Sequence, residues 1–277
     1  MTRATIHPVT PDLCYMSQAI NPKGARKYLP GARPSDWVAD YLGSSVGQKV
    51  LVAITGLSLT TFVLFHMIGN LKMFSGRDSI NAYAEFLKHD LGVLIWVARA
   101  GLAGTLAIHL FTTIRLKLKT KAARPVGYFM QKTAQASPQS KLMLSTGLVT
   151  AAFIAFHLAH FTFGYVHDAG VDGGARVNYM DLKDDEGRHD VYSIVISGFS
   201  TPWISALYIV CQILLFLHLT HGIPSSLQTL GLVGRRFTPA ARALGYGLAT
   251  VVLLGNLAII VAVWTGYLPP VSGLTRG

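Results

Sequence analysis

The stretch TGLSLTTFVLFH, Thr55 to His66, is followed ninety-one residues later by a near copy, TGLVTAAFIAFH, Thr146 to His157. Both segments are apolar enough for a lipid bilayer, and both end in a histidine. A histidine is costly to place at membrane depth, so one that recurs there at the same spacing is by default a candidate for function. The repeat predicts two equivalent membrane helices with a shared polar role.

The composition around this repeat is that of a membrane protein. The chain has 277 residues, of which 51% are hydrophobic and 13% charged, and its mean hydropathy is +0.42. Windows of roughly 20 mostly apolar residues suffice to cross a hydrocarbon core. Five such windows lack any Asp or Glu: Val46–Met73, Gly92–Ile114, Leu142–Tyr165, Pro202–Leu227 and Ala240–Leu268. We therefore predict an all-α membrane protein with five transmembrane helices.

The spans divide the chain into three regions. Residues 1–45 form an N-terminal extension, residues 46–268 a membrane domain with outer loops at 74–91 and 166–200, and residues 269–277 a C-terminal tail. The extension has no apolar core typical of a signal peptide, so the first helix is expected to insert itself. Its Pro and Gly content argues against a long helix. We expect an irregular segment that lies on a cytoplasmic partner, with a disordered tail as the alternative.

The distribution of Lys and Arg predicts the orientation. Six basic residues lie within 1–49, seven within 115–141 and three within 235–242, whereas the segment 168–190 has three basic against seven acidic residues. Because short cytoplasmic loops are enriched in Lys and Arg, the N-terminus is expected inside and the C-terminus outside. The net charge of +11 then belongs mainly to the inner surface. It fits contact with anionic lipid or with a cytoplasmic partner, and nucleic acid is not expected.

Six of the ten histidines fall within the spans: His66, His109, His157, His160, His218 and His221. At 1.5 Å per residue, four of them form two levels, with His66 and His157 near the outer face and His109 and His218 near the inner face. Pairs of imidazoles from facing helices suit axial ligation of haem. The two His-x-x-His pairs also fit zinc. However, the spans contain no carboxylate to neutralise the charge of a zinc ion, whereas haem carries its own propionates.

Three further residues belong to the expected haem environment. Arg99 lies at about the depth of the outer pair, where it fits either a propionate partner or an arginine that extends to the lipid interface. Gly56 and Gly147 each precede their histidine by ten residues, which puts them near the level of the inner pair. A glycine there would let a macrocycle approach the backbone, or would simply allow close helix packing.

From Trp37 to Leu268 the chain resembles the cytochrome b subunit of bacterial succinate dehydrogenases, the five-helix, di-haem type shared with some fumarate reductases. The similarity rests on FVLFHMIGNLKMF, LAIHLFTT, Thr146-Gly147 ten residues before His157, STPWISALYIV and LHLTHG. It implies that two haem b groups bind, the outer one through His66 and His157 and the inner one through His109 and His218. His160 and His221 leave open which member of each pair binds iron. A glutamate found in one branch of the family is replaced here by Phe216.

The resemblance also implies a function and partners. The chain would be the membrane anchor that carries electrons from an iron-sulfur subunit to a quinone, most simply menaquinone, while a flavoprotein (FAD) subunit oxidises succinate. It would lie in a bacterial cell membrane, and the resemblance also allows another small membrane subunit as a partner. The alternatives are a fumarate reductase working in reverse, a His-lined metal-ion or proton transporter, and a haem-free anchor. Candidate groups for the quinone site are Tyr83, Glu85, His89 and His160 on the outer side and His221 and Ser225 on the inner side.

Overall fold

The computed structural model describes residues 34–123, 138–170 and 176–271. Five helices in these ranges are long and apolar enough to cross a membrane, which confirms the predicted all-α membrane fold. They cover Ser45–Ser75, Val93–Ala122, Ser140–Thr162, Pro202–Thr229 and Arg235–Trp264. Each contains most of one predicted window.

The part of the N-terminal extension that is described is helical, which corrects the expectation of an irregular segment there. Helix α2 covers Pro34–Gly43 and starts at a proline, the residue favoured in a first helical turn. After it, the Ser44 hydroxyl donates to the Tyr41 carbonyl and accepts from the Gly47 amide. The expected docking of residues 1–33 lies outside the described residues.

The long helices differ from the predicted windows mainly at their ends. Helix α3 covers Ser45–Asn70 and continues as a 3-10 turn to Ser75. Helix α5 covers Val93–Ala122, eight residues past the predicted end, because Arg and Lys favour helix and extend their charges out of the lipid. Helix α6 covers Pro138–His157 and ends in a π-helical turn, Leu158–Thr162.

The last two spans are α8, Pro202–Thr229, and α9, Thr238–Trp264. Helix α9 ends before the predicted Leu268 because Gly266 follows with φ of 75°, a left-handed conformation that suits glycine.

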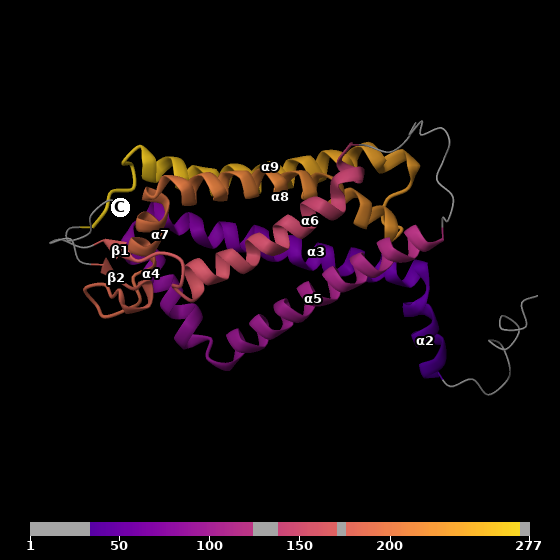
Figure 1. The fold of residues 1–277 in the computed structure, drawn as a ribbon, viewed down its shortest axis with the longest axis horizontal. Helices are drawn as coiled ribbons and strands as arrows, with labels where there is room; N and C mark the ends of the chain where they lie inside the picture. The colour runs from indigo at the N-terminus through magenta and orange to yellow at the C-terminus, as the bar shows by residue number, and fades with distance from the viewer. Residues whose placement is uncertain (1–33, 124–137, 171–175, 272–277) are drawn as a thin grey trace, which may run out of the picture. The chain divides into compact units, whose positions relative to one another are not determined.

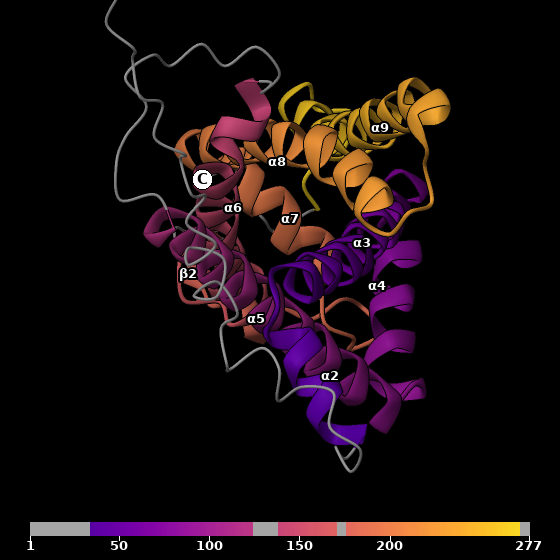
Figure 2. The ribbon, with the colours of Figure 1, turned by 90° about the vertical axis from the view of Figure 1, so that its right-hand side faces the viewer.

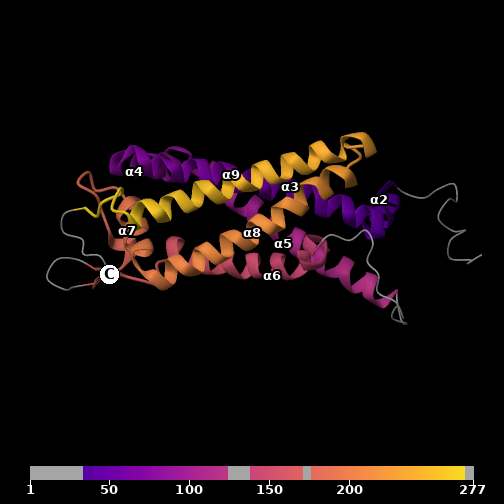
Figure 3. The ribbon, with the colours of Figure 1, turned by 90° about the horizontal axis from the view of Figure 1, so that it is seen from above.

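Helix α8 lies between α6 and α9, as the views in Figures 2 and 3 agree. The Asn256 amide of α9 donates to the Gln212 carbonyl oxygen of α8 over 3.1 Å. Further along, a Cβ on Gly245 would lie 2.7 Å from Pro224 Cδ, so only glycine allows this approach of the two helices. Helix α5, by contrast, buries only Thr112 among its described residues.

One end of the membrane domain carries a folded cap, where the sequence predicted only loops (Figure 1). It consists of helices α4, Arg77–Glu85, and α7, Val191–Ser200, together with a π-helical turn, Phe86–Asp90. The two-residue strands β1, Ala169–Gly170, and β2, Arg176–Val177, pair antiparallel beside them.

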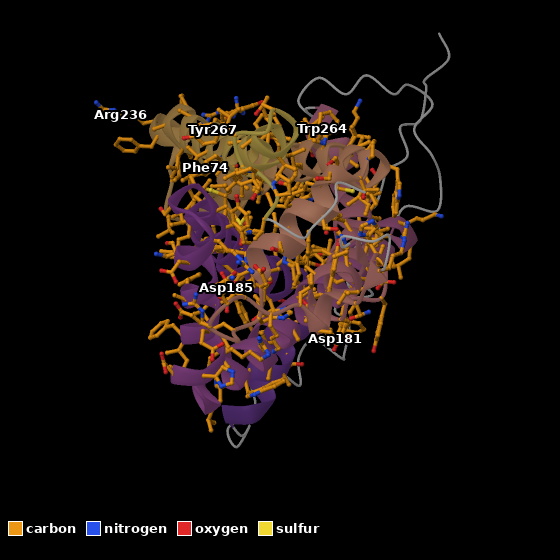
Figure 4. All side chains as sticks on the ribbon, turned by 90° about the vertical axis from the view of Figure 1, so that its left-hand side faces the viewer. Phe74, Asp181, Asp185, Arg236, Trp264 and Tyr267 are labelled. Carbon is orange, nitrogen blue, oxygen red and sulfur yellow. The ribbon has the colours of Figure 1, made fainter. Side chains whose placement is uncertain are left out.

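A buried ionic network joins the parts of the cap. Arg77 donates to Asp190 at 2.7 Å, and the Asn81 amide donates to Asp190 at 3.0 Å. Arg188 donates to Asp184 at 2.8 Å. Asn81, Asp184 and Asp190 are buried, whereas Asp185 is exposed at this end (Figure 4). The network ties α4 to the start of α7 across more than a hundred residues of sequence.

Candidate functional site

The inner histidines each lie against a threonine of the repeated Thr-Gly pair. His109 Nδ1 of α5 is 3.0 Å from Thr55 Oγ1 of α3. His218 Nδ1 of α8 is 3.3 Å from Thr146 Oγ1 of α6. The two copies of the repeat therefore make the same contact with two different helices.

The threonines also determine which nitrogen of each histidine carries the proton. Thr55 Oγ1 is 2.7 Å from the Leu51 carbonyl and Thr146 Oγ1 is 3.0 Å from the Leu142 carbonyl, so each hydroxyl hydrogen is donated within its own helix. A hydroxyl has only one hydrogen to donate. Each threonine oxygen must therefore accept from Nδ1–H of its histidine, which leaves the Nε2 lone pair available to a metal ion.

The glycines that follow the threonines provide space for the same two rings. A Cβ on Gly56 would lie 3.1 Å from His109 Cε1, and a Cβ on Gly147 would lie 3.1 Å from His218 Cε1. Any other residue would have to displace the imidazole. The structure thus gives both glycines a specific role: they admit a histidine ring from the neighbouring helix.

The outer histidines face each other directly. The ring centroids of His66 and His157 are 5.8 Å apart, with the planes at 87°. His66 also stacks on Phe62, with centroids 5.4 Å apart. Two imidazoles on opposite sides of one metal ion, with metal–nitrogen bonds of about 2 Å, have centroids roughly 6 Å apart. The spacing of this pair is of that size.

His157 and His160, which the sequence did not separate, have different surroundings. His157 faces His66, whereas His160 is fully buried against α7. A Cβ on Gly198 of α7 would lie 3.0 Å from His160 Cε1. Both histidines share the hydroxyl of Tyr208, at 3.2 Å from His157 Nδ1 and 3.0 Å from His160 Nδ1.

The other candidate residues occupy separate settings. Tyr83 packs on Gly69 at the outer end of α3 and lies under the Lys72 ammonium. Glu85 is paired with His89 over 3.4 Å on the cap surface. Arg99 is exposed on α5 over its neighbour Trp96. His221 is half-buried near Arg242. No hydrogen bond, ion pair or ring contact among the described residues joins Tyr83, Glu85 and His160.

The histidines lie in pairs rather than in larger clusters. Across residues 34–123, 138–170 and 176–271, no group of three or more His, Cys, Asp or Glu side chains is placed to hold a metal ion. A structural zinc site in proteins takes four such ligands. The described residues therefore offer no four-ligand zinc site.

Sequence reasoning missed two features of the site. The sequence shows the Thr-Gly spacing, but it does not show that His109 and His218 hydrogen-bond to Thr55 and Thr146. The recurrence of threonine beside both glycines was the available signal. Tyr208 gave no signal, because its role depends on a contact between α8 and α6. No protein-family model, curated protein or solved structure was found to match the chain.

Proposed function

We propose that this chain is the di-haem cytochrome b anchor of a succinate dehydrogenase, carrying electrons from an iron-sulfur subunit to a membrane quinone. The observation that carries the proposal is the duplicated inner arrangement. In it, Thr55 and Thr146 leave Nε2 of His109 and His218 free, while Gly56 and Gly147 make room for both rings. The iron-sulfur donor, the quinone acceptor and the link to succinate dehydrogenase are proposed from the resemblance to the cytochrome b subunit.

The residues present suit a bis-imidazole haem at each level. His109 and His218 would hold the inner group, and His66 and His157 the outer one. A haem held by these residues would supply one-electron transfer. The chain itself would orient the imidazoles through threonine and tyrosine hydroxyls and would exclude water with its apolar helices. Arg99 is the candidate cation for a propionate, and His221 belongs to the expected haem environment.

Quinone reduction consumes protons, so a quinone site needs a proton-exchanging group near the outer or inner haem. Oxidation of succinate by a low-potential quinone such as menaquinone is uphill, and electron movement across the membrane would offset it. That favours the outer face, with Tyr83, Glu85 and His160 as candidates. The basic inner surface would face the iron-sulfur and flavoprotein subunits, which places the N-terminus in the cytoplasm of a bacterial cell.

The reduced-minus-oxidised spectrum of the purified chain tests the proposal. We expect a b-type signal from two haems per chain. His66→Ala or His157→Ala should remove the outer haem and keep much of the inner one, and His109→Ala or His218→Ala should do the reverse. Replacement of His89, an exposed histidine on the cap, is the matched control and should keep both. Bound zinc, or no chromophore, would contradict the proposal.

A further inference from the structure

Tyr208 is buried at the outer histidine level, where its hydroxyl contacts two imidazoles. It lies on α8, and both histidines lie at the end of α6. Its ring makes edge contacts with Phe153 and Phe199, with centroids 5.0 and 5.1 Å away. The aromatic packing holds the ring in place, so the position of the hydroxyl is set by the fold rather than by solvent.

The hydroxyl of Tyr208 cannot donate to both imidazoles. A phenol has one hydrogen to donate, and each neutral imidazole has one donor and one acceptor nitrogen. Both contacts use Nδ1, and the Tyr208 hydrogen has no other acceptor among the described residues, so one histidine accepts from the hydroxyl while the other donates to its oxygen. A histidine that binds a metal ion through Nε2 carries its proton on Nδ1, which identifies His157 as the donor.

We infer that Tyr208 is a positioning residue that fixes the orientation and tautomer of His157, with His160 as the acceptor that orients the phenol. This inference rests on the proposed function, because the metal-binding role of His157 sets the direction of the two hydrogen bonds at Tyr208. The order is His157 Nδ1–H to Tyr208 Oη, then Tyr208 O–H to His160 Nδ1. It is the outer counterpart of the threonine contacts at the inner level.

His160 is held by the cap. Its ring is fully buried, lies 4.0 Å from the Phe161 ring centroid, and packs on the backbone of Gly198. With Nδ1 accepting, the proton of His160 is on Nε2, which has no hydrogen-bond partner among the described residues. Helix α7, which carries Gly198, is tied to α4 by Asp190. The cap therefore orients His157 through His160 and Tyr208.

The test is Tyr208→Phe in the full-length chain, which keeps the ring packing and removes only the hydroxyl. Losing the acceptor for Nδ1–H makes the imidazole a weaker ligand. We expect the reduction potential of the outer haem to rise and its low-spin electron paramagnetic resonance signal to shift, with the inner haem unchanged. The outer signal is the one lost in His66→Ala. Tyr246→Phe, on the exposed face of α9, is the matched control and should change neither haem.

A second variant tests the contribution of the cap and keeps the Tyr208 hydroxyl and both imidazoles. Gly198→Ala puts a carbon 3.0 Å from His160 Cε1 and should shift the same outer signal. Gly104→Ala on α5, which meets nothing within 4 Å, should not. A two-haem preparation whose outer signal ignores Tyr208→Phe would overturn the role of Tyr208 alone. A wild-type chain without haem would overturn the proposed function itself.

Discussion

Among single residues, the hydroxyl hydrogens of Thr55 and Thr146 are the most important for the candidate site. Thr55 and Thr146 donate within their own helices, so their oxygens accept from His109 and His218. Hydrogen bonding of this kind often stabilises a metal ligand in one tautomer. A threonine in a soluble helix commonly donates to the carbonyl of the preceding turn without any further partner. Here its oxygen accepts from a histidine of the neighbouring helix, which is a proposed haem ligand.

Thr55→Val and Thr146→Val should therefore weaken the inner haem selectively. The volume barely changes, but the acceptor for Nδ1–H is lost, so we expect roughly 10- to 100-fold weaker haem retention at the inner level. The measurement is haem content and the inner-haem spectrum after washing with apo-acceptor protein. Thr105→Val is the control, because the Thr105 hydroxyl donates to its own helix on an exposed face. Equal retention in all three variants would count against the contact.

Gly56→Ala and Gly147→Ala probe the space rather than the hydrogen bond. Each new methyl carbon would lie 3.1 Å from an imidazole Cε1, so the ring must move, and we expect loss or a spectral shift of the inner haem. Gly101→Ala, with nothing within 4 Å, controls for the effect of alanine in a membrane helix. The outer haem should stay unchanged in all of them, and a shift there instead would show that the two levels were misassigned.

Among the elements, the cap at one end of the bundle depends on Asp190, which links α7 to α4. Asp190 caps α7 by accepting from the Ser193 amide and also binds Arg77 and Asn81 of α4. Burial would raise the pKa of the Asp190 carboxyl, but hydrogen bonds from Arg77, Ser193 and Asn81 outweigh it and hold the pKa below 3.8. The ionised carboxylate thus stabilises the folded cap.

Asp190→Asn should open the cap. Removing one partner of a buried pair costs about 3–5 kcal/mol, and we expect the lower end because Arg77 keeps 22% exposure. Hydrogen exchange of the amides of residues 184–194 measures it. Asp185→Asn removes an exposed partner of the same arginine and should cost about 0–1 kcal/mol. Similar hydrogen-exchange protection in both variants would show that burial of the Arg77–Asp190 contact does not stabilise the cap.

The same carboxylate predicts how cap stability depends on pH. Because the folded pKa of Asp190 is lowered, its contribution is complete above the unfolded value of about 3.8. It is lost as the pH falls below that value and through the folded pKa. Protection of the cap amides should thus be constant near neutral pH, fall in acid, and lose this acid step in Asp190→Asn.

At the scale of the whole molecule, charge and hydropathy separate the two ends of the membrane domain. The acidic cap lies at one end, and the basic ends of α5 and α9 lie at the other (Figure 1). At the cap end, Phe74 and Tyr267 lie together, with ring centroids 6.2 Å apart (Figure 4). Aromatic rings of this kind favour the membrane interface.

Thiol labelling tests the orientation that this asymmetry predicts. In a chain with Cys14 and Cys211 replaced by Ser, a new cysteine at Asp185 should react with an impermeant reagent added outside intact cells. A new cysteine at Lys121, near the end of α5, should react only after the membrane is permeabilised. Detergent-solubilised protein, in which both sites must react, is the control. The reverse pattern would invert the topology.

The five spans, their approximate ends and the expectation of two histidine levels all follow from the amino-acid sequence. These follow from hydropathy, from charge and from the rise per residue along a helix, all of which act along a single coordinate, the depth in the bilayer. The ends shifted where other forces acted, as at Gly266 and along the basic end of α5. Helices α2, α4 and α7 were not predicted, because α2 and α4 have no long apolar run and α7, although apolar, is too short at ten residues to span a bilayer.

Only the tertiary structure decided which residues meet at each depth. Depth alone does not say that His109 contacts Thr55 rather than Thr146, or that Tyr208 lies between His157 and His160. Such contacts depend on the rotation of each helix about its axis and on its neighbours, which α8 acquires by packing between α6 and α9. The sequence therefore placed the histidines in the membrane, and the packing of the helices determined the partner of each ring.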